Sequence, residues 1–245
     1  MKNLLLFLFC VVVFSALNGQ AYASGSRFDN FSYNVSEENL EAFTKDMAGL
    51  IGSGTYSTGR ILGWGGFLLS GRGAAMPKTS KKNTALGKDD EVMYMPWIQG
   101  EIGLPFRLDG YIRASSWNGL TVAGGGLKWG VTRPVDTLYS FQTMITVLAQ
   151  SAVHKDFTMT HYNANLVVSF KMPVVTPYIG GGVDYARLTV EGAADTSLIN
   201  KTEYTTTPRA SAGLNFKLPE YMDLSLAANY ASYGFGGEAS FGVRF

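Results

Sequence analysis

Charge, cysteine and histidine are all scarce in this sequence. Charged residues make up 16% of its 245 residues, and 20 Lys and Arg nearly balance 19 Asp and Glu. This balance excludes the basic surface that nucleic-acid binding requires, and it offers no polybasic segment for a membrane surface. A single cysteine cannot form a disulfide framework, and two histidines without further cysteines make no usual zinc site. We therefore expect no nucleic-acid partner, no metal and no other cofactor.

Glycine and aromatic residues are abundant instead. The chain contains 29 Gly, and Phe, Trp and Tyr together make up 13% of it. With so few charges, this composition excludes intrinsic disorder and coiled coil. The totals alone are those of a soluble all-β protein, of one or two domains at this length.

Residues 1–23 have the three parts of a secretory signal peptide. Lys2 is positively charged, residues 4–17 are apolar, and Ala21-Tyr22-Ala23 is an A-x-A cleavage site. The apolar stretch is shorter than the ~20 residues that a membrane-spanning helix needs. We predict that cleavage removes Lys2 and Cys10, which leaves an exported chain without cysteine or net charge. Something other than disulfides must then stabilise it.

An amphipathic helix is predicted over residues 36–52, within an N-terminal periplasmic segment of residues 24–57. Ser36 can cap its first turn, the glutamates that follow suit the positive end of the helix dipole, and Gly52 can end it. Its apolar residues share one face at helical spacing: Leu40, Phe43, Met47 and Leu50. We expect this face to pack against the domain that follows.

From about residue 58 the hydrophobic period changes to two. Between Tyr162 and Phe170 every second residue is apolar and the intervening ones are mostly polar. Residues 209–218 and 222–230 alternate in the same way. Segments of ~10 residues of this kind are typical of transmembrane β-barrels, in which one face meets lipid and the other the lumen. A soluble sandwich also alternates, so this pattern alone does not decide between them.

The connections between the alternating segments differ in length. Ten strands are predicted, at residues 58–71, 92–104, 107–116, 120–132, 137–150, 157–171, 175–190, 203–218, 222–233 and 236–245. The connections after the second, fourth, sixth and eighth are short and contain proline, whereas residues 72–91 and 191–202 form long polar loops. Such asymmetry is typical of the periplasmic and extracellular ends of an outer-membrane barrel. We predict a closed antiparallel transmembrane barrel of about ten strands over residues 58–245, with eight or twelve as alternatives.

The last strand supports this interpretation independently. Phe241, Val243 and Phe245 alternate with small or polar residues, and Phe245 is the final residue. The pattern resembles the C-terminal signal of bacterial outer-membrane barrels, which the barrel-assembly machinery recognises. Residues 177–186, which contain three consecutive glycines, resemble strands of small barrels of the OmpA, OmpX and OmpW kind. The resemblance covers the chain from about residue 58. It implies a monomer in the outer membrane of a Gram-negative bacterium, with lipid, lipopolysaccharide and the assembly machinery as partners.

The alternation assigns each residue to the lipid or the lumen. The predicted lipid-facing band comprises Tyr94, Ile98, Ile102, Leu127, Trp129, Ile145, Val147, Leu166, Phe216, Leu226 and Phe241. The predicted aromatic girdle comprises Tyr94, Trp129, Tyr139, Phe170, Tyr185, Phe216, Tyr230 and Phe245. The predicted polar lining of the lumen comprises Glu101, Arg107, Asp109, Arg113, Lys128, His161, Asn163, Asn165, Lys171, Asp184, Arg209, Asn215, Lys217, Asp223, Asn229, Glu238 and Arg244. Mixed signs favour internal ion pairs, such as Glu101 with Arg107 or Arg113, over an open pore. A ten-stranded barrel is also only slightly wider than one that side chains fill.

Glycines also project into the predicted lumen. They are Gly103, Gly124, Gly126, Gly130, Gly180, Gly182, Gly213 and Gly242. Such glycines relieve barrel curvature or allow a close approach of another segment. One hypothesis is that the 36–52 helix enters or caps the periplasmic mouth, with Leu40, Phe43 and Met47 against this space.

The sequence shows no catalytic motif, and we expect no enzymatic activity. His154, in the loop at 151–156 near Ser115 and Ser116, is expected to be a solvated loop residue, and His161 a hydrogen-bonded residue of the lumen. The glycine triplets lack the helix that a phosphate-binding loop requires. A structural or surface-interaction barrel is the first interpretation, with loop 72–91 offering a lipopolysaccharide-binding set of Arg72, Lys78, Lys81, Lys82 and Lys88. The alternatives are a narrow channel for small solutes and, third, a lipid-modifying enzyme that uses His154.

Overall fold

The computed structural model describes residues 27–87, 92–219 and 221–245, so the predicted signal peptide lies outside the described residues. Three helical elements come first: η1 (Arg27–Asn30), α2 (Phe31–Asn34) and α3 (Glu37–Gly52). The strands are β1 (Phe67–Met76), β2 (Met93–Leu104), β3 (Leu108–Trp117), β4 (Leu120–Gly130), β5 (Phe141–Val153), β6 (Phe157–Phe170), β7 (Val175–Val190), β8 (Thr202–Lys217), β9 (Met222–Ala231) and β10 (Gly234–Arg244). A short 3-10 helix, η2 (Thr196–Leu198), lies between β7 and β8.

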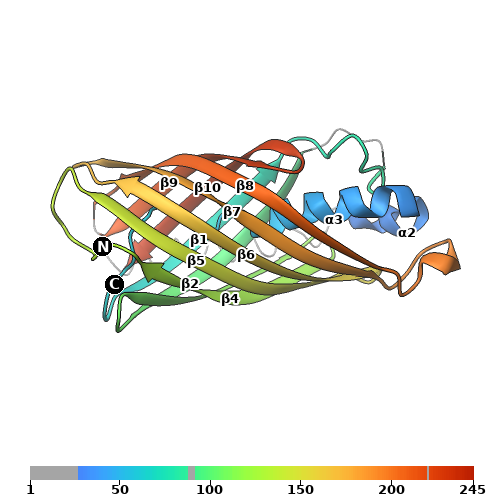
Figure 1. The fold of residues 1–245 in the computed structure, drawn as a ribbon, viewed down its shortest axis with the longest axis horizontal. Coiled ribbons are helices and arrows are strands. Elements are labelled where there is room, and N and C mark those ends of the chain that lie inside the picture. The colour runs from blue at the N-terminus through green and yellow to red at the C-terminus, as the bar shows by residue number, and fades with distance from the viewer. Residues whose placement is uncertain (1–26, 88–91, 220) are drawn as a thin grey trace.

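The strands form one closed antiparallel barrel (Figure 1). Each strand pairs with its neighbours along the chain, and β1 closes the ring by pairing with β10, where Leu69 lies opposite Val243. Closure leaves no unpaired edge strand, so the backbone groups of the wall are satisfied within the barrel. The predicted ten-stranded barrel is confirmed.

The barrel has two different ends. The first, which we call the Phe245 end, holds the C-terminus and the connections at 105–107, 131–140, 171–174 and 218–221. The second, which we call the loop end, holds the long connections at 77–92 and 191–201 and three tight turns. The predicted length asymmetry therefore rests on two loops, and the connection at 131–140 is longer than predicted because β5 begins at Phe141.

The first strand was predicted incorrectly. Residues 58–66 are not part of the wall; β1 begins at Phe67 and continues to Met76, beyond the predicted end at 71. Residues 58–62 instead lie inside the barrel, where Gly59 and Ile61 are buried, and residues 63–66 lead out of it, where Trp64 is exposed. Ile61, Leu62 and Trp64 gave this stretch an apolar content like that of a strand, and composition does not reveal which side of the wall such residues occupy.

The outer wall is apolar and bordered by aromatic side chains at both ends. Of the predicted lipid-facing residues, nine are exposed, while Phe216 and Phe241 are partly buried. At the Phe245 end the ring of Phe67 lies 5.9 Å from that of Phe245. Towards the loop end Tyr162 and Tyr185 face each other across β6 and β7, with ring centroids 6.2 Å apart. Two such belts, one at each border of an apolar band, are typical of membrane barrels.

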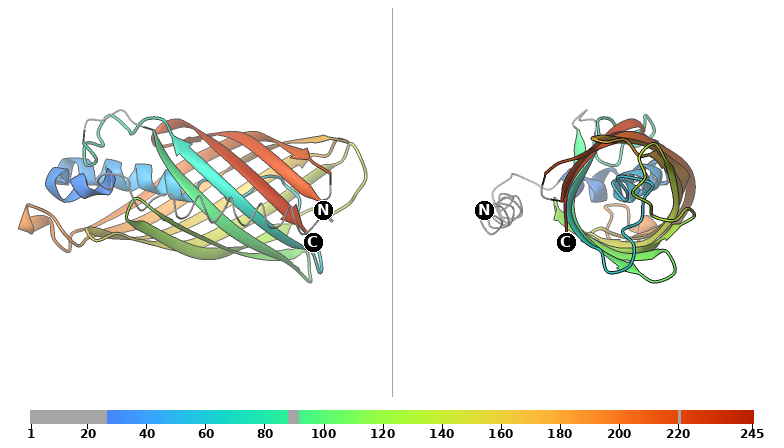
Figure 2. Two further views of the ribbon diagram at one scale, coloured as in Figure 1. Left: turned by 180° about the vertical axis from the view of Figure 1, so that it is seen from behind. Right: turned by 90° about the vertical axis from the view of Figure 1, so that its left-hand side faces the viewer.

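Helix α3 forms as predicted but lies at the other mouth. It enters the barrel from the loop end, opposite the C-terminus (Figures 1 and 2). The backbone N–H of Ser36 donates to Asn39 Oδ1 at 2.9 Å, which completes the first turn. Residues 53–66 connect α3 to β1 through the interior, and extended chain of that length spans the ~25 Å apolar band of an outer-membrane barrel. The length of this connection is what allows the helix to lie at the mouth farthest from the start of β1.

The apolar face of α3 packs against the lumen-facing residues of the strands near the loop end. Leu40, Phe43, Met47 and Leu50 are all fully buried. The Phe43 ring lies 5.2 Å from that of Phe157, which begins β6. This packing forms one hydrophobic core with Met95, Trp97, Leu188 and other inward residues near the loop end. The predicted packing of Leu40, Phe43 and Met47 against the inward glycines is therefore wrong.

Candidate functional site

The most elaborate polar site in the described residues is the centre of the lumen, where α3 ends. We call residues 51–55 the anchor segment. Their backbone carbonyls accept hydrogen bonds from four strands. Gln150 of β5 donates to Ile51 O at 2.7 Å, and Arg113 of β3 donates to Ser53 O at 3.0 Å. Arg72 of β1 donates to Gly54 O at 3.2 Å, and Gln99 of β2 donates to Thr55 O at 3.3 Å. The last carbonyls of a helix lack intrahelical partners. In α3 the wall satisfies that of Ile51, and Ser53 and Thr55 of the anchor segment satisfy those of Gly49, Leu50 and Gly52.

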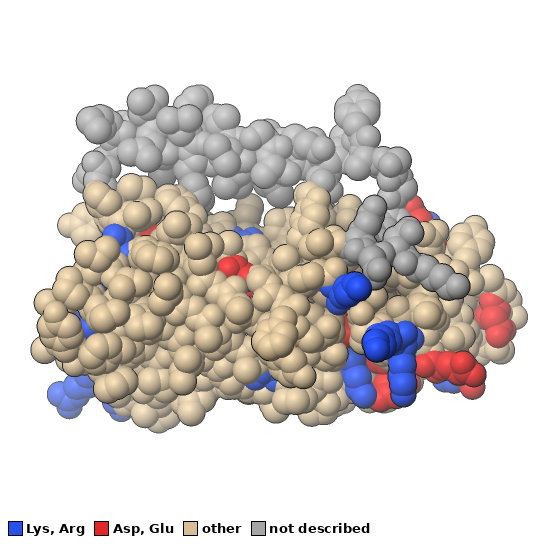
Figure 3. All heavy atoms as spheres, turned by 90° about the horizontal axis from the view of Figure 1, so that it is seen from above, with Lys and Arg blue, Asp and Glu red and all other residues tan. Residues whose placement is uncertain are grey.

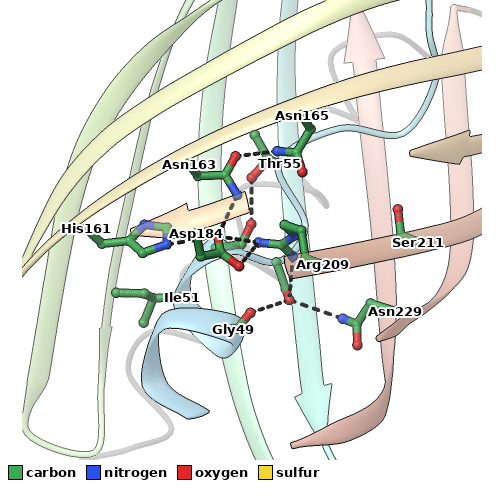
Figure 4. Close-up of polar contacts among 12 residues, drawn as sticks. Gly49, Ile51, Thr55, His161, Asn163, Asn165, Asp184, Arg209, Ser211 and Asn229 are labelled. Carbon is green, nitrogen blue, oxygen red and sulfur yellow. Dashed lines mark hydrogen bonds and ion pairs between the residues drawn. The ribbon is translucent and has the colours of Figure 1, made fainter. Parts of the chain in front are cut away.

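The side chain of Ser53 extends this contact to two more strands. Its hydroxyl oxygen accepts from Arg209 Nη2 of β8 at 3.0 Å and from Asn229 Nδ2 of β9 at 3.1 Å (Figure 4). The same hydroxyl donates to Gly49 O at 2.7 Å. Six of the ten strands therefore hold the anchor segment, and Ser53 is its centre.

Arg113 is held by the anchor segment rather than by an acid. Its side chain is buried, and its guanidinium lies 3.6 Å from the centre of the Trp97 ring. Within residues 27–87, 92–219 and 221–245, no carboxylate forms an ion pair with it. Its polar partners are Ser53 O and the Thr55 hydroxyl, at 3.2 Å. A helix C-terminus carries a partial negative charge, so α3 supplies the electrostatic partner that Arg113 otherwise lacks.

A first ion cluster lies on β1, β2 and β4. Glu101 accepts from Arg72 at 2.7 Å through Oε1 and from Lys128 at 2.6 Å through Oε2, and all three side chains are buried. The predicted partners of Glu101, Arg107 and Arg113, are therefore wrong. Arg72, which was assigned to a basic external loop, is a lumen residue because β1 extends to Met76.

A second cluster lies on β6, β7 and β8. Asp184 accepts from Arg209 Nη1 and from His161 Nε2, both at 3.0 Å, and from Asn163 at 2.7 Å (Figure 4). Arg209 also lies 3.7 Å from Glu238 of β10. The prediction that His161 is a hydrogen-bonded lumen residue agrees with these contacts.

Most of the predicted polar lining is buried inside the barrel. These residues are Glu101, Asp109, Arg113, Lys128, His161, Asn163, Asn165, Lys171, Asp184, Arg209, Asn215, Asp223 and Asn229. Glu238 and Arg244 are partly buried, and Arg244 donates to Asp223 at 3.2 Å. Arg107 and Lys217 are exposed instead, because Arg107 lies in the β2–β3 connection and Lys217 is the last residue of β8, where the alternation ends.

The lumen residues that sequence reasoning missed are Arg72, Gln99, Gln150 and the anchor segment itself. Gln99 and Gln150 are polar residues at inward positions of β2 and β5, so the alternation would have found them. The anchor segment offers no such signal, because its contribution is mainly through backbone carbonyls.

Below the anchor segment, residues 56–66 cross the lumen toward the Phe245 end; we call them the strap. The Tyr56 hydroxyl lies 2.8 Å from Ser211 Oγ of β8, and Thr58 Oγ1 lies 3.3 Å from Ser169 Oγ of β6. At the other side of the barrel, the carboxylate of Asp109 accepts from the backbone N–H of Leu62 at 2.6 Å. The strap therefore crosses the lumen near the Phe245 end, from β8 to β3.

Three of the predicted inward glycines make room for the strap. A Cβ at Gly103 would lie 1.6 Å from Gly63 O, one at Gly180 would lie 2.2 Å from the Tyr56 hydroxyl, and one at Gly130 would lie 2.8 Å from Ile61. The backbone approaches closely at these points, which only glycine permits. The segment that these glycines receive is the strap rather than α3.

Charge pairing also closes the Phe245 end. Arg60 of the strap lies 2.9 Å from Asp136 in the β4–β5 connection, and Lys171 donates to the same carboxylate at 2.7 Å. The hydrogen bond from Lys171, with the charge of Arg60, lowers the pKa of Asp136 to about 2. A pocket beside the anchor segment, lined by Gly54, Tyr56 and Arg72 among others, has a volume of about 10 Å³, which is room for about one water molecule. Sites for small-molecule ligands usually enclose ~300–1,000 Å³.

His154 is buried, contrary to expectation. Its ring lies 5.5 Å from that of Phe28 in η1 and 5.0 Å from that of Phe157. Burial lowers the pKa of His154, although Asp156 opposes the shift. Phe28 covers His154 itself, because the N-terminal segment lies at this end of the barrel.

No group of three or more His, Cys, Asp and Glu among the described residues is arranged to hold a metal ion. None of the helices in the described part of the chain combines the length and apolarity needed to cross a membrane.

Comparison with known proteins gives architecture only. No protein-family model and no curated protein sequence matches the chain. Among solved structures, the N-terminal β-barrel domain of Pseudomonas aeruginosa OprF is 12% identical, with 75% of this chain and 99% of that one covered and a TM-score of 0.36. Ail, the attachment invasion locus protein of Yersinia pestis, is 12% identical, with 74% and 99% covered and a TM-score of 0.34. Neisserial surface protein A is 15% identical, with 73% and 95% covered and a TM-score of 0.32. These small outer-membrane barrels are what the chain resembles, and the likeness carries no argument about function.

Proposed function

We propose that the protein is a plugged outer-membrane barrel: a structural scaffold that presents its loop end at the cell surface and whose lumen its own N-terminal segment closes. The observation that carries this proposal is the set of hydrogen bonds from six strands to the anchor segment. Such a set would be needless in an open pore, and it places a folded segment across the middle of the lumen. We propose outer-membrane lipid, lipopolysaccharide and the barrel-assembly machinery as partners of a monomer.

The proposed location rests on the wall. An apolar band between two aromatic belts suits a lipid bilayer, and a closed barrel leaves no backbone group unsatisfied in it. The long connections at 77–92 and 191–201 lie at the loop end, and outer-membrane barrels carry their longer loops outside. The Phe245 end is then periplasmic, which suits the proposed assembly signal of Phe241, Val243 and Phe245.

The buried ion clusters argue against the channel alternative. Each acid of the two clusters forms an ion pair with at least one cation, and Arg113 is hydrogen-bonded at the C-terminus of α3. A solute would have to displace both the anchor segment and the strap. No observation favours a lipid-modifying enzyme, because His154 is enclosed by Phe28 and Phe157.

Planar-bilayer recording tests the closed lumen. We expect the full chain to give no stable conductance. A variant without residues 27–66 should raise the current by about tenfold or more, because it removes both the anchor segment and the strap from a barrel wider than the side-chain-filled eight-stranded kind. A heat-modifiable band on gel electrophoresis verifies that each sample is a folded barrel.

A second variant keeps the whole chain. Arg113→Glu places a negative charge against the carbonyls of the anchor segment, so intermittent openings are expected. Stable conductance from the unmodified full chain would refute the proposal.

A further inference from the structure

The N-terminal segment is fastened to the connections of the loop end. Asp29 pairs with Lys155 of the β5–β6 connection at 3.0 Å. The backbone N–H of Ala194, in the β7–β8 loop, donates to Ser32 O at 2.7 Å. Lys201, at the end of that loop, pairs with Glu37 at the start of α3. These contacts place residues 29–37 beside the two connections.

Asp46 of α3 fastens the segment to two further connections. Its Oδ2 accepts from the Ser80 backbone N–H and from Asn83 Nδ2, both at 2.8 Å and both from the β1–β2 loop. Its Oδ1 accepts from the Ser232 hydroxyl in the β9–β10 turn at 3.2 Å. Burial raises the pKa of Asp46, and these hydrogen bonds oppose the shift. Four of the five connections at this end therefore contact residues 28–46.

The strands that surround α3 extend beyond the aromatic belt. Past Tyr185 the outward residues of β7 are Arg187 and Thr189, and past Tyr162 those of β6 are Thr160 and Thr158. Outward residues of this polarity belong in water rather than lipid. Figure 3 shows charged side chains gathered over the same end, while the barrel wall in that view is mostly uncharged. The core around Phe43 and Leu188 thus lies inside an extension of the barrel that rises out of the membrane.

We infer that residues 27–45 are displayed on the outer surface of the cell, and that the chain returns through the lumen by the end of α3, the anchor segment and the strap to begin β1. This inference rests on the proposed membrane orientation. It assigns the outer surface to a composite of η1, α2, residues 77–87 and the β7–β8 loop, rather than to loops alone. Tyr33, which is 78% exposed, lies on this surface.

Site-specific labelling of whole cells tests the inference. The background is Cys10→Ser, which removes the only cysteine of the chain. Single cysteines are placed by Tyr33→Cys in α2, by Thr196→Cys in the β7–β8 loop and by Thr137→Cys in the β4–β5 connection. All three positions are exposed, and the last lies at the Phe245 end. The probe is a maleimide on a polyethylene glycol chain too large to pass through porins.

We expect Tyr33→Cys and Thr196→Cys to react equally on intact cells and on disrupted cells, and Thr137→Cys to react only after disruption. If Thr196→Cys reacts on intact cells and Tyr33→Cys does not, the display of the N-terminal segment is refuted while the orientation stands. If Thr137→Cys alone reacts on intact cells, the barrel is inverted and the inference fails with the orientation. Neither result depends on whether the lumen conducts, so the closed-lumen proposal is tested separately.

Discussion

Replacing Arg209 with Met is expected to lower the free energy of unfolding by about 3–5 kcal/mol, the range for removing one partner of a buried ion pair. The Arg209 guanidinium lies 3.0 Å from Asp184, and both side chains are almost completely buried. Met has a similar length but no charge, so Asp184 would keep its negative charge without its main partner. Ser53 would also lose one of the two donors that hold it to the wall. Urea unfolding of the refolded protein, followed by the heat-modifiable band, measures the change.

Arg107→Met is the matched control. Arg107 was also predicted to line the lumen, but it is exposed, and its guanidinium donates to Val131 O in the neighbouring connection. An exposed residue outside a packed site changes stability by roughly 0.5 kcal/mol or less. Equal effects of the two substitutions would contradict the burial of the Asp184 cluster.

The second large effect is expected for Gly103→Val in β2. A Cβ at this position would lie 1.6 Å from Gly63 O and 2.6 Å from the carbonyl carbon of the same residue. The obstacle is backbone, which cannot move aside as a flexible side chain can. We expect a loss of about 3 kcal/mol, at the upper end of the usual cost of overpacking. The strap should also become open to proteolysis near Arg60, which cleavage by trypsin would detect.

Gly100→Val in the same strand is the control for the second prediction. A Cβ on Gly100 has open space around it, with no atom within 4 Å. Valine suits a strand and a lipid-facing position, so the stability should not fall. A loss with Gly100→Val as large as that with Gly103→Val would show that β2 tolerates no side chain at either glycine, and would remove the argument for the strap.

Alternation predicted the wall because each strand of the barrel lies between two very different environments. Along β6 the buried residues include His161, Asn163 and Asn165, and the exposed ones include Tyr162 and Leu166. A strand register shifted by one residue would place these polar groups in lipid. The alternation of polar and apolar residues is therefore regular along the strand. The bounds of β7 were predicted correctly for this reason.

The choice of ion-pair partner could not be predicted in the same way. Glu101 lies opposite Leu68 of β1 and Tyr111 of β3, yet its charged partners are Arg72 and Lys128. Lys128 is on β4, two strands away. Such contacts depend on how far the tilted strands are staggered and on the reach of long side chains across the lumen, and neither is written in the alternation of one strand.

The path of the N-terminal segment was the largest gap. Ser36 was correctly predicted as the N-cap of α3, because capping is decided by neighbouring residues, whereas Gly52 belongs to the last turn and Ser53 is the C-cap. The mouth that the helix occupies depends instead on tertiary contacts: the fit of Phe43 to the core at the loop end, and the wall donors that receive residues 51–55. Once the segment is known to run through the lumen, the inward position of Gly103 and Gly180 has a physical reason.

A disulfide between α3 and the wall tests the central claim most directly. An ideal Cβ on Gly49 lies 2.8 Å from the Cβ of Ala231 at the end of β9. Disulfides join Cβ atoms roughly 3.5–4.5 Å apart, so a shift of about 1 Å brings the pair into range. Gly49→Cys with Ala231→Cys, in the Cys10→Ser background, is oxidised in the refolded full chain, and the crosslinked peptides are identified by mass spectrometry. Gly49→Cys with Ala228→Cys, whose side chain faces outward on the same strand, is the control.

We predict that the Gly49–Ala231 pair forms an intramolecular disulfide in nearly every heat-modifiable molecule, and that the control pair forms none. Free thiols at positions 49 and 231 in a correctly folded barrel would contradict the claim that the N-terminal segment occupies the lumen.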